Sequence, residues 1–308
     1  MTRAIRATFS YRRLVVLALL MAPVTGVWLW AESRGMQVLA AEVADEPRLT
    51  IRCAVIGGMT DTGFWQEASN RFTNETGLAV EVVSTGPKYE IAPAFRRGEA
   101  DLITMHASDT IINLVADGYG ADPQPWARND LLLVGPKNDP AKIRGLKDSV
   151  AALGKIIESK SKLLVHQSLG TNEVLHDLLA EGELELDKDS TIVLPSDRHR
   201  QLLQKAAREG AYTIVGRIPF LNGKIPNDGL ELMVQGDPRM RRPYVVVVSS
   251  ANEPGSPRDQ AARRLAAFLR SAETQRWIGE FGRGKLDDRP LFFPVVVGKN
   301  AGEAAAKK

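Results

Sequence analysis

The hydrophobic residues of this chain follow two spacings, and the two take turns along the sequence. From residue 49 to 55 they occupy every second position, which predicts a strand ending at Gly57-Gly58. Phe64, Ala68 and Phe72 recur at the spacing of one helix face, and the helix they predict is closed by Gly77. Further strands are predicted at 78–83, 100–105, 131–134, 162–165, 211–215 and 244–249. Further helices are predicted at 87–97, 108–117, 146–159, 171–180, 197–209, 259–270 and 273–281. This alternation predicts an α/β protein with mostly parallel sheets covered by helices.

The first 40 residues have the composition of an export signal. Residues 1–13 carry four arginines and no acid, and a hydrophobic run over 14–31 follows them. Cleavage after Ala40 would place Val38 and Ala40 at the two recognition positions. The hydrophobic run also just reaches the length of a membrane span, so a retained anchor is the alternative, and a buried helix is a third reading. The first two predict that most of the chain lies outside the cytoplasm.

Composition and charge narrow the class of protein further. The chain has 308 residues, 44% hydrophobic and 25% charged, as in a globular protein long enough for two lobes or domains. Its single cysteine excludes an intramolecular disulfide framework. The net charge of +3 is too small to suggest a nucleic-acid partner. Residues 1–40 hold five arginines and one acid, so the rest of the chain is close to neutral, at about −1.

Motifs for catalysis and metal binding are missing from the sequence. There is no G-x-S-x-G or H-E-x-x-H motif, and the four histidines lack the spacing of metal ligands. Residues 279–285 fit G-x-x-x-x-G-K, but Leu286 stands where a phosphate-binding loop needs a hydroxyl. These glycines also follow a predicted helix, so we interpret them as its C-terminal end. We predict no enzymatic activity, no metal site and no cofactor.

Short motifs occur in a fixed order between residues 49 and 294. They include Asp117-Gly118-Tyr119-Gly120, Asn129-Asp130-Leu131-Leu132-Leu133-Val134-Gly135-Pro136, Val234-Gln235-Gly236-Asp237-Pro238 and Leu291-Phe292-Phe293-Pro294. As an ordered set they resemble the extracytoplasmic solute-binding proteins of ABC transporters, in particular the tungstate-binding type within the periplasmic-binding-protein superfamily.

The resemblance implies a two-lobed α/β fold of the periplasmic-binding-protein type II kind, with a ligand held between the lobes. Two crossing strands would form the hinge, for which 131–134 and 244–249 are the best candidates. The predicted boundaries are 48–130 with 250–297 for lobe one and 131–249 for lobe two, followed by a disordered tail at 298–308. The resemblance also suggests a monomer.

The predicted ligand loops depart from the family pattern. Relatives have a loop rich in Thr and Ser after the first strand, where this chain keeps fewer hydroxyls. In lobe two, relatives have a Ser-Arg-Gly-Asp-x-Ser-Gly-Thr-His loop, whereas residues 164–172 keep Gly170-Thr171 and lose the arginine. Arg217 or Lys88 could supply a cation from another direction. The predicted ligand-binding residues are Gly57, Gly58, Thr60, Thr62, Thr85, His106, Ser168, Gly170, Thr171 and Arg217.

These features predict an extracytoplasmic protein that captures a small oxyanion, similar to tungstate or molybdate, and delivers it to an ABC permease. Helix N-termini from both lobes would offer N–H groups and a positive dipole end to such an anion. The alternative is a membrane-tethered sensing or binding module of the same fold whose ligand has changed or been lost.

Overall fold

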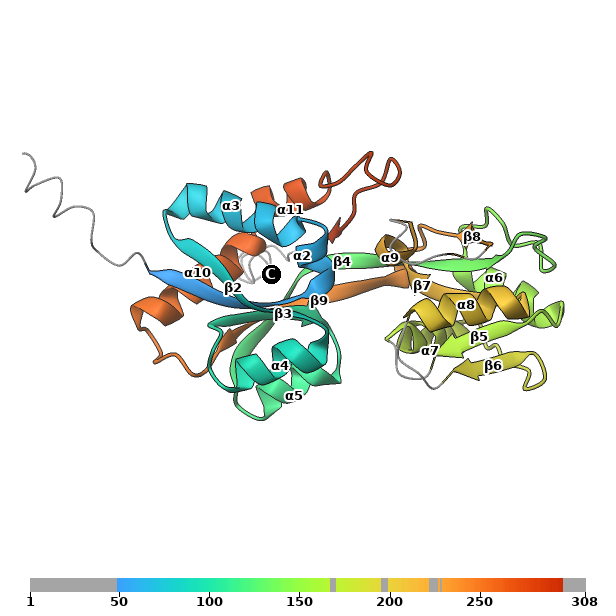
Figure 1. Ribbon diagram of the computed structural model, residues 1–308, viewed down its shortest axis with the longest axis horizontal. Coiled ribbons are helices and arrows are strands. Elements are labelled where there is room, and N and C mark those ends of the chain that lie inside the picture. The colour runs from blue at the N-terminus through green and yellow to red at the C-terminus, as the bar shows by residue number, and fades with distance from the viewer. Residues whose placement is uncertain (1–48, 167–169, 195–198, 222–226, 228, 296–308) are drawn as a thin grey trace, which may run out of the picture. The chain divides into compact units, whose positions relative to one another are not determined.

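The structure is a computed structural model that describes residues 49–166, 170–194, 199–221, 227 and 229–295 (Figure 1). The predicted export signal or anchor, Ser168 and the predicted tail at 298–308 lie outside the described residues. None of the helices that the structure describes is both long enough and apolar enough to cross a membrane.

Lobe one is the set of elements packed around β2, β1, β3, β9 and the first part of β4, which are neighbours in that order. Its strands are β1 (Thr50–Ile56), β2 (Ala79–Gly86), β3 (Leu102–His106), β4 (Gly120–Pro136), β9 (Arg241–Ser249) and the short β10 (Phe293–Pro294). Its helices are α2 (Gly57–Asp61), α3 (Phe64–Thr76), α4 (Lys88–Arg96), α5 (Asp109–Ala116), α10 (Pro257–Leu269) and α11 (Ala272–Ile278). Helices α3, α10 and α11 lie on one face of these strands, and α4 and α5 lie on the other (Figure 1).

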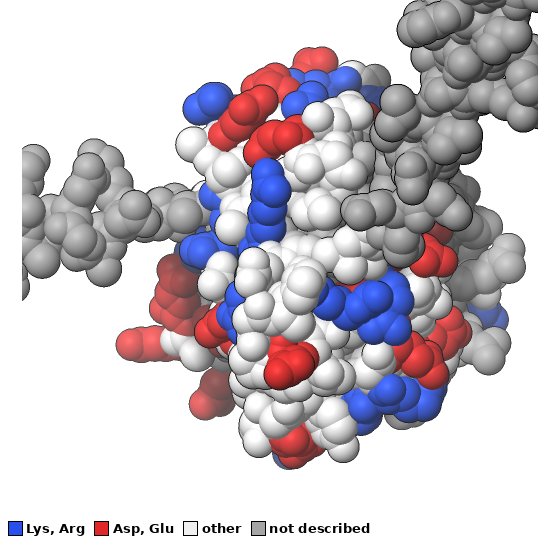
Figure 2. Space-filling view, turned by 90° about the vertical axis from the view of Figure 1, so that its left-hand side faces the viewer, with Lys and Arg blue, Asp and Glu red and all other residues white. Residues whose placement is uncertain are grey.

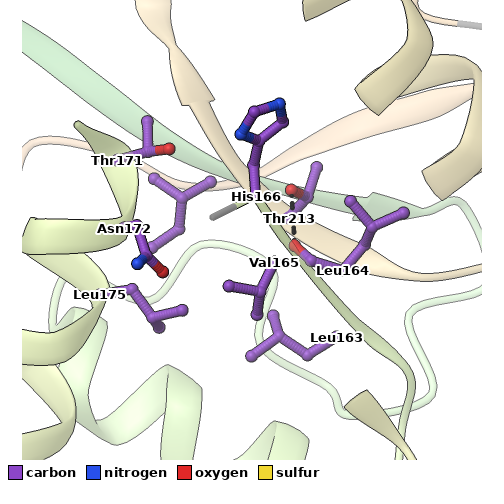
Figure 3. Close-up of a pocket in the computed structure, with 9 residues that line it drawn as sticks. Leu163, Leu164, Val165, His166, Thr171, Asn172, Leu175 and Thr213 are labelled. Carbon is purple, nitrogen blue, oxygen red and sulfur yellow. Dashed lines mark hydrogen bonds between the residues drawn. The ribbon is translucent and has the colours of Figure 1, made fainter. Parts of the chain in front are cut away.

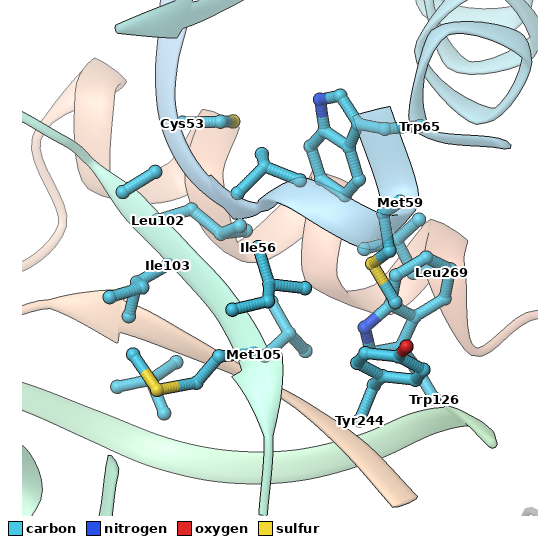
Figure 4. Close-up of a cluster of buried hydrophobic side chains, with 14 of the residues drawn as sticks. Cys53, Ile56, Met59, Trp65, Leu102, Ile103, Met105, Trp126, Tyr244 and Leu269 are labelled. Carbon is cyan, nitrogen blue, oxygen red and sulfur yellow. The ribbon is translucent and has the colours of Figure 1, made fainter. Parts of the chain in front are cut away.

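The core of lobe one joins segments from both ends of the described chain. Phe64 at the start of α3 stacks on Phe292, with ring centroids 4.0 Å apart, and on Trp277, at 5.1 Å. Met59, Trp126 and Tyr244 pack in the same hydrophobic cluster (Figure 4). The segment after α11 is therefore built into the core of lobe one.

Lobe two is the set of elements around the second part of β4, which continues the strand order through β7, β5 and β6. Its further strands are β5 (Leu163–His166), β6 (Thr191–Leu194), β7 (Tyr212–Gly216) and β8 (Leu230–Val234). Its helices are α6 (Ser149–Glu158), α7 (Thr171–Glu181), α8 (His199–Glu209), α9 (Arg217–Leu221) and the 3-10 turn η1 (Pro238–Met240). Two separate buried clusters pack around these strands, one with α6 and α7 and the other with α8.

Strand β4 passes through both lobes. Its first part pairs with β9 up to Asp130, opposite Arg241, and its second part pairs with β7 and β8 from Leu131 onward. The pairs that β9 forms all lie in lobe one, with β3 and β4, so the second connection between the lobes is the chain between η1 and β9. Arg241 and Arg242 stand where that connection enters lobe one.

The sheet is mixed, which corrects the expectation of mostly parallel pairing. The pairs β1–β2, β1–β3, β5–β6 and β5–β7 are parallel, whereas every pair that β4 or β9 makes is antiparallel. A strand that returns from the other lobe enters its sheet in the opposite direction, and this reverses the local pairing.

Charged side chains of both signs mingle on the face of the protein shown in Figure 2. Lysines and arginines there lie next to aspartates and glutamates, and no single sign dominates that face. This agrees with the nearly neutral charge that the sequence gives to residues 41–308. Recognition of a charged ligand must therefore depend on a few placed groups.

Candidate ligand-binding site

Two strand ends of lobe one meet where β1 runs directly into α2. A Cβ added at Gly57 would lie 3.4 Å from the Gly86 Cα atom, so the ends of β1 and β2 approach closely here. Thr60 Oγ1 donates a hydrogen bond to the Gly57 carbonyl at 2.9 Å and lies 2.8 Å from Thr85 Oγ1. Because the Thr60 proton is already used, Thr85 donates to Thr60. The Thr85 hydroxyl could serve an anion by turning toward it.

Thr62 occupies a different place from Thr60. It is the C-cap of α2, and its hydroxyl donates to the carbonyls of Gly58 and Met59 at 3.0 and 3.2 Å. These bonds satisfy the end of a short helix. The Thr62 hydroxyl is therefore used within α2, whereas the Thr60 hydroxyl joins α2 to Thr85 of β2.

His106, at the end of β3, packs against Tyr244 of β9. Their ring centroids are 4.2 Å apart, with the planes tilted by 32°. A Cβ added at Gly58 would lie 4.0 Å from the Tyr244 hydroxyl oxygen, so the first turn of α2 reaches the same place. Burial raises the pKa of Tyr244, and nearby Arg242 opposes the shift. Tyr244 is thus a neutral hydroxyl donor between two of the predicted ligand residues.

Lobe two contributes the start of α7. Helix α7 has 11 residues, and its N-cap is Gly170, which has no side chain to cap the helix. Beside it is a pocket of about 10 Å³, which is room for one water molecule. Figure 3 shows that leucine and valine side chains form much of its wall, with Thr171 at one edge, and that the Thr213 hydroxyl donates to the Leu164 carbonyl at 2.9 Å. This pocket is too small and too apolar to hold a tetrahedral anion.

Arg242 lies at the N-terminus of α7. The space in which Gly170 would carry a Cβ is filled by the Arg242 guanidinium group. The Arg242 side chain is 12% exposed, and its Nη2 atom is buried with no hydrogen-bond partner among the described residues. Glu173 Oε2 stands 3.9 Å from Nη2, too far for a hydrogen bond. Burial lowers the pKa of Arg242, and Glu173 acts against that shift.

Lys88 is a second cation close to Arg242. It is the first residue of α4, and burial is the main reason that its pKa lies below the usual lysine value. The next cause is repulsion from Arg242, while Glu173 and Asp109 act in the opposite direction. Lys88 and Arg242 therefore share one partly dehydrated environment.

Arg217 has structural partners in place of a ligand. Its side chain is fully buried, donates from Nη1 to the Pro290 carbonyl at 2.8 Å and forms an ion pair with Asp287. This guanidinium ties α9 to the segment after α11. We therefore leave Arg217 outside the candidate site, although the sequence suggested it as a substitute for the missing loop arginine.

The sequence prediction of the site omitted Arg242. Its only sequence signal is the pair Arg241-Arg242, which Pro243-Tyr244 separates from a run of buried valines. Side chains alternate along a strand, so two adjacent arginines point to opposite faces. Arg241 stacks over Phe293 at 4.1 Å, whereas Arg242 reaches α7.

The arrangement is suited to binding an anion. It combines a guanidinium, an ammonium, hydroxyl groups and the N-terminus of α7, all of which favour negative charge. Within the described residues there is no group of three His, Cys, Asp or Glu side chains that could hold a metal ion. Gly279, in the segment that imitates a phosphate-binding loop, is the C-cap of α11, as we interpreted it.

Comparison with known proteins adds independent support. The family model described as bacterial extracellular solute-binding protein matches residues 51–283. A tungstate-binding protein, TupA, of Peptoclostridium acidaminophilum is 29% identical over 250 residues, which cover 80% of this chain and 85% of that protein. A putative ABC transporter anion-binding protein of Haloferax volcanii is 28% identical over 268 residues, covering 84% and 76%.

A solved structure shares the fold. The tungstate-binding protein TupA from Desulfovibrio alaskensis G20 matches with a TM-score of 0.65 and 22% identity, covering 80% of this chain and 99% of that one. The resemblance seen in the sequence motifs is confirmed by these matches. So is the predicted fold class, a two-lobed α/β fold. Of the two strands expected to cross, the one at 131–134 is part of β4, which does pass between the lobes, whereas 244–249 lies in β9, which pairs only within lobe one.

Proposed function

Because the chain belongs to the bacterial extracellular solute-binding proteins, we propose that it captures a small oxyanion between its lobes and delivers it to an ABC permease. The relatives support both parts of this proposal, since one is named for tungstate binding and the other as an anion-binding protein of an ABC transporter. Tungstate and molybdate are therefore the first ligands to test. We further propose that the protein acts as a monomer and has no catalytic activity.

One observation in the structure carries the proposal. Arg242 and Lys88 converge on the N-terminus of α7, and the buried Nη2 atom of Arg242 has no hydrogen-bond partner among the described residues. Buried polar groups in proteins are almost always hydrogen-bonded, and an unsatisfied cation is costly. An anion bound here would supply the missing acceptor.

The candidate ligand-binding residues are divided between the two lobes. Lys88, His106, Thr60 and Thr85 belong to lobe one, and the start of α7 belongs to lobe two. A ligand that contacts both lobes favours the closed arrangement by its extra affinity for it, and a hinge motion about the crossing segments follows.

Isothermal titration calorimetry with tungstate, molybdate, sulfate and phosphate tests the function. We expect saturable heat with at least one of them, together with a higher melting temperature. At a ligand concentration 100 times Kd the added stability is about 2.7 kcal/mol, which raises Tm by roughly 5–10 °C for a chain of this size. Neither heat nor a shift with any of the four would overturn the oxyanion proposal and leave the fold unchanged.

We also propose that the protein acts outside the cytoplasm, delivered there by the export signal at 1–40. Mass spectrometry of the protein purified from its native membrane and soluble fractions measures its N-terminus. A start near Ala41 supports cleavage and a free carrier. An intact residue 14–31 segment would instead favour a tethered binding module.

A further inference from the structure

We propose that Arg242, on the hinge-side end of β9, is the cation that anchors the ligand and that Lys88 completes a two-cation site selective for doubly charged tetrahedral oxyanions. This inference rests on the proposed function and names the residues and the ligand charge. It also explains how a chain without an arginine in its lobe-two loop can still bind an anion. The guanidinium comes from the strand that enters lobe one, and it reaches the start of α7 from there.

The first argument is the contact between Arg242 and Gly170. Any side chain at Gly170 would collide with the guanidinium, so the glycine leaves the room that Arg242 occupies. Gly170 has a φ of −65°, which every residue type can adopt, so backbone conformation does not require a glycine here. The close approach of the guanidinium is the feature that does.

The second argument is the environment of the guanidinium. It lies against the positive end of α7, where a cation is unfavourable unless an anion is present. Its Nη2 atom is buried and has no hydrogen-bond partner in the described part of the chain. Glu173, the acid that faces it, is 61% exposed and 3.9 Å away, so it neutralises Arg242 only weakly.

The third argument is the charge of the ligand. Burial lowers the pKa of Lys88, and repulsion from nearby Arg242 lowers it further, so two positive charges face the site. A singly charged anion can neutralise one of them and leaves the other in a dehydrated place. A doubly charged anion neutralises both, and its oxygens can accept from the guanidinium and the ammonium together.

Arginine geometry gives a further expectation. A guanidinium offers two parallel N–H groups to two oxygens of a tetrahedral anion, whereas an ammonium is a point charge. Arg242→Lys keeps the charge and loses the fork. It should therefore retain part of the affinity.

The test compares tungstate with perrhenate, which is also a tetrahedral oxyanion but carries one negative charge where tungstate carries two. Titration calorimetry on the full chain gives the affinities of wild type, Arg242→Gln, Arg242→Lys and Lys88→Gln. Arg264→Gln, which removes an exposed arginine on α10, is the matched control. Sulfate and molybdate are included so that any dianion that binds wild type can serve as the probe.

We expect wild type to prefer the dianion strongly. Arg242→Gln should weaken dianion binding by roughly 100-fold or more, and Lys88→Gln by roughly 10-fold, while Arg264→Gln changes nothing. Lys88→Gln should also narrow the preference for tungstate over perrhenate, because one cation then remains. Arg242→Lys should lie between wild type and Arg242→Gln.

Failure of this inference is distinguishable from failure of the proposed function. Wild type that binds none of the anions refutes the function and the two-cation site with it. If Arg242→Gln and Lys88→Gln both bind a dianion as tightly as wild type does, the proposed function stands and the two-cation site is refuted. Melting temperatures without anion check folding, and if Arg242→Gln does not fold, Arg242→Lys and Lys88→Gln decide the matter.

Discussion

At the scale of single residues, Glu173 competes with the ligand for Arg242. Its carboxylate stands 3.9 Å from Nη2 in the first turn of α7, where it opposes an incoming anion. We expect Glu173→Gln to tighten dianion binding by roughly threefold to tenfold, a small effect because Glu173 is 61% exposed and screened by solvent. Titration at low and high salt measures it, with the difference shrinking as salt rises.

Asp177→Asn is the control for this prediction. It removes the same charge from an exposed position on α7, one turn further from the N-terminus. Equal changes in the two variants would show that the effect comes from net charge alone. Weaker binding in Glu173→Gln would show that the carboxylate helps to position Arg242.

Lys88 makes binding depend on pH in the alkaline range. Burial and Arg242 lower its pKa, and the other groups that face it are Glu173 on α7 and Asp109 on α5. As pH rises through the lowered pKa, Lys88 loses its charge and dianion affinity falls. Titrations from about pH 7 to about pH 10 should show this fall in wild type and a flatter profile in Lys88→Gln. Parallel profiles would contradict the assignment.

In the absence of ligand, the lowered pKa of Lys88 makes the folding stability rise with pH, whereas it makes the dianion affinity fall. Between the lowered pKa and 10.5, the unfolded chain holds a proton on Lys88 that the folded protein lacks. The unfolded state then binds more protons, so the contribution of Lys88 to stability rises with pH. The difference in unfolding free energy between wild type and Lys88→Gln should follow this direction.

Sequence reasoning placed part of the candidate site, and the ligand-binding role of the residues it named stays a prediction. Gly57, Gly58, Thr60, Thr85 and His106 come from strand ends, whose positions hydrophobic spacing predicts well. Arg242 could not be found in that way, because its role depends on which face of β9 points toward α7. Only the register of β9 against β3 and β4 fixes that face.

At the scale of elements, the contact between the start of α7 and Arg242 of β9 predicts a variant that weakens ligand binding with little effect on folding stability. Gly170→Ala places a Cβ where the Arg242 guanidinium lies and should displace that flexible side chain. We expect dianion affinity to fall by roughly 10-fold, since the guanidinium loses its position. Stability should change by no more than about 1 kcal/mol, because the φ of −65° suits alanine and the displaced side chain is flexible.

Gly154→Ala is the matched control within α6. A Cβ there would lie 3.8 Å from Leu184 Cδ2, an ordinary contact, and a glycine inside a helix costs about 0.5–1 kcal/mol relative to alanine. Calorimetry and urea unfolding should show higher stability with unchanged binding for this variant. Unchanged binding in Gly170→Ala would show that Arg242 is not needed in its observed position.

The sequence misjudged the start of β4, and this error has a physical cause. Strand β4 begins at Gly120, whereas the predicted start was residue 131. The earlier part was not predicted because Pro123 and Pro125 are unusual within a strand. Its pairing with β9 shifts register on both sides of these prolines, between Ala121 and Gln124 and between Pro125 and Ala127. A bulged strand loses the regular alternation from which strands are predicted.

At the scale of the whole molecule, Asp130 joins the crossing point of β4 to the C-terminal segment. Its side chain is fully buried, forms an ion pair with Arg289 and lies 3.9 Å from Arg241 Nε. Arg289 and Arg241 both lie over the ring of Phe293, which belongs to β10. At the point where β4 passes between the two lobes, one buried carboxylate therefore faces two cations.

Asp130→Asn should be strongly destabilising because it removes the buried carboxylate that faces the partly buried cations Arg289 and Arg241. We expect a loss of about 3 kcal/mol in the free energy of unfolding, measured by urea denaturation. Asp122→Asn is the control in the same strand, since Asp122 pairs with Arg263 at the surface, where a pair is worth less than about 1 kcal/mol. Equal small losses in the two variants would mean that the Asp130 cluster contributes no more than a surface pair. A large loss confined to Asp130→Asn, with dianion affinity retained, would separate the ions that hold the crossing together from the Arg242 and Lys88 pair that holds the ligand.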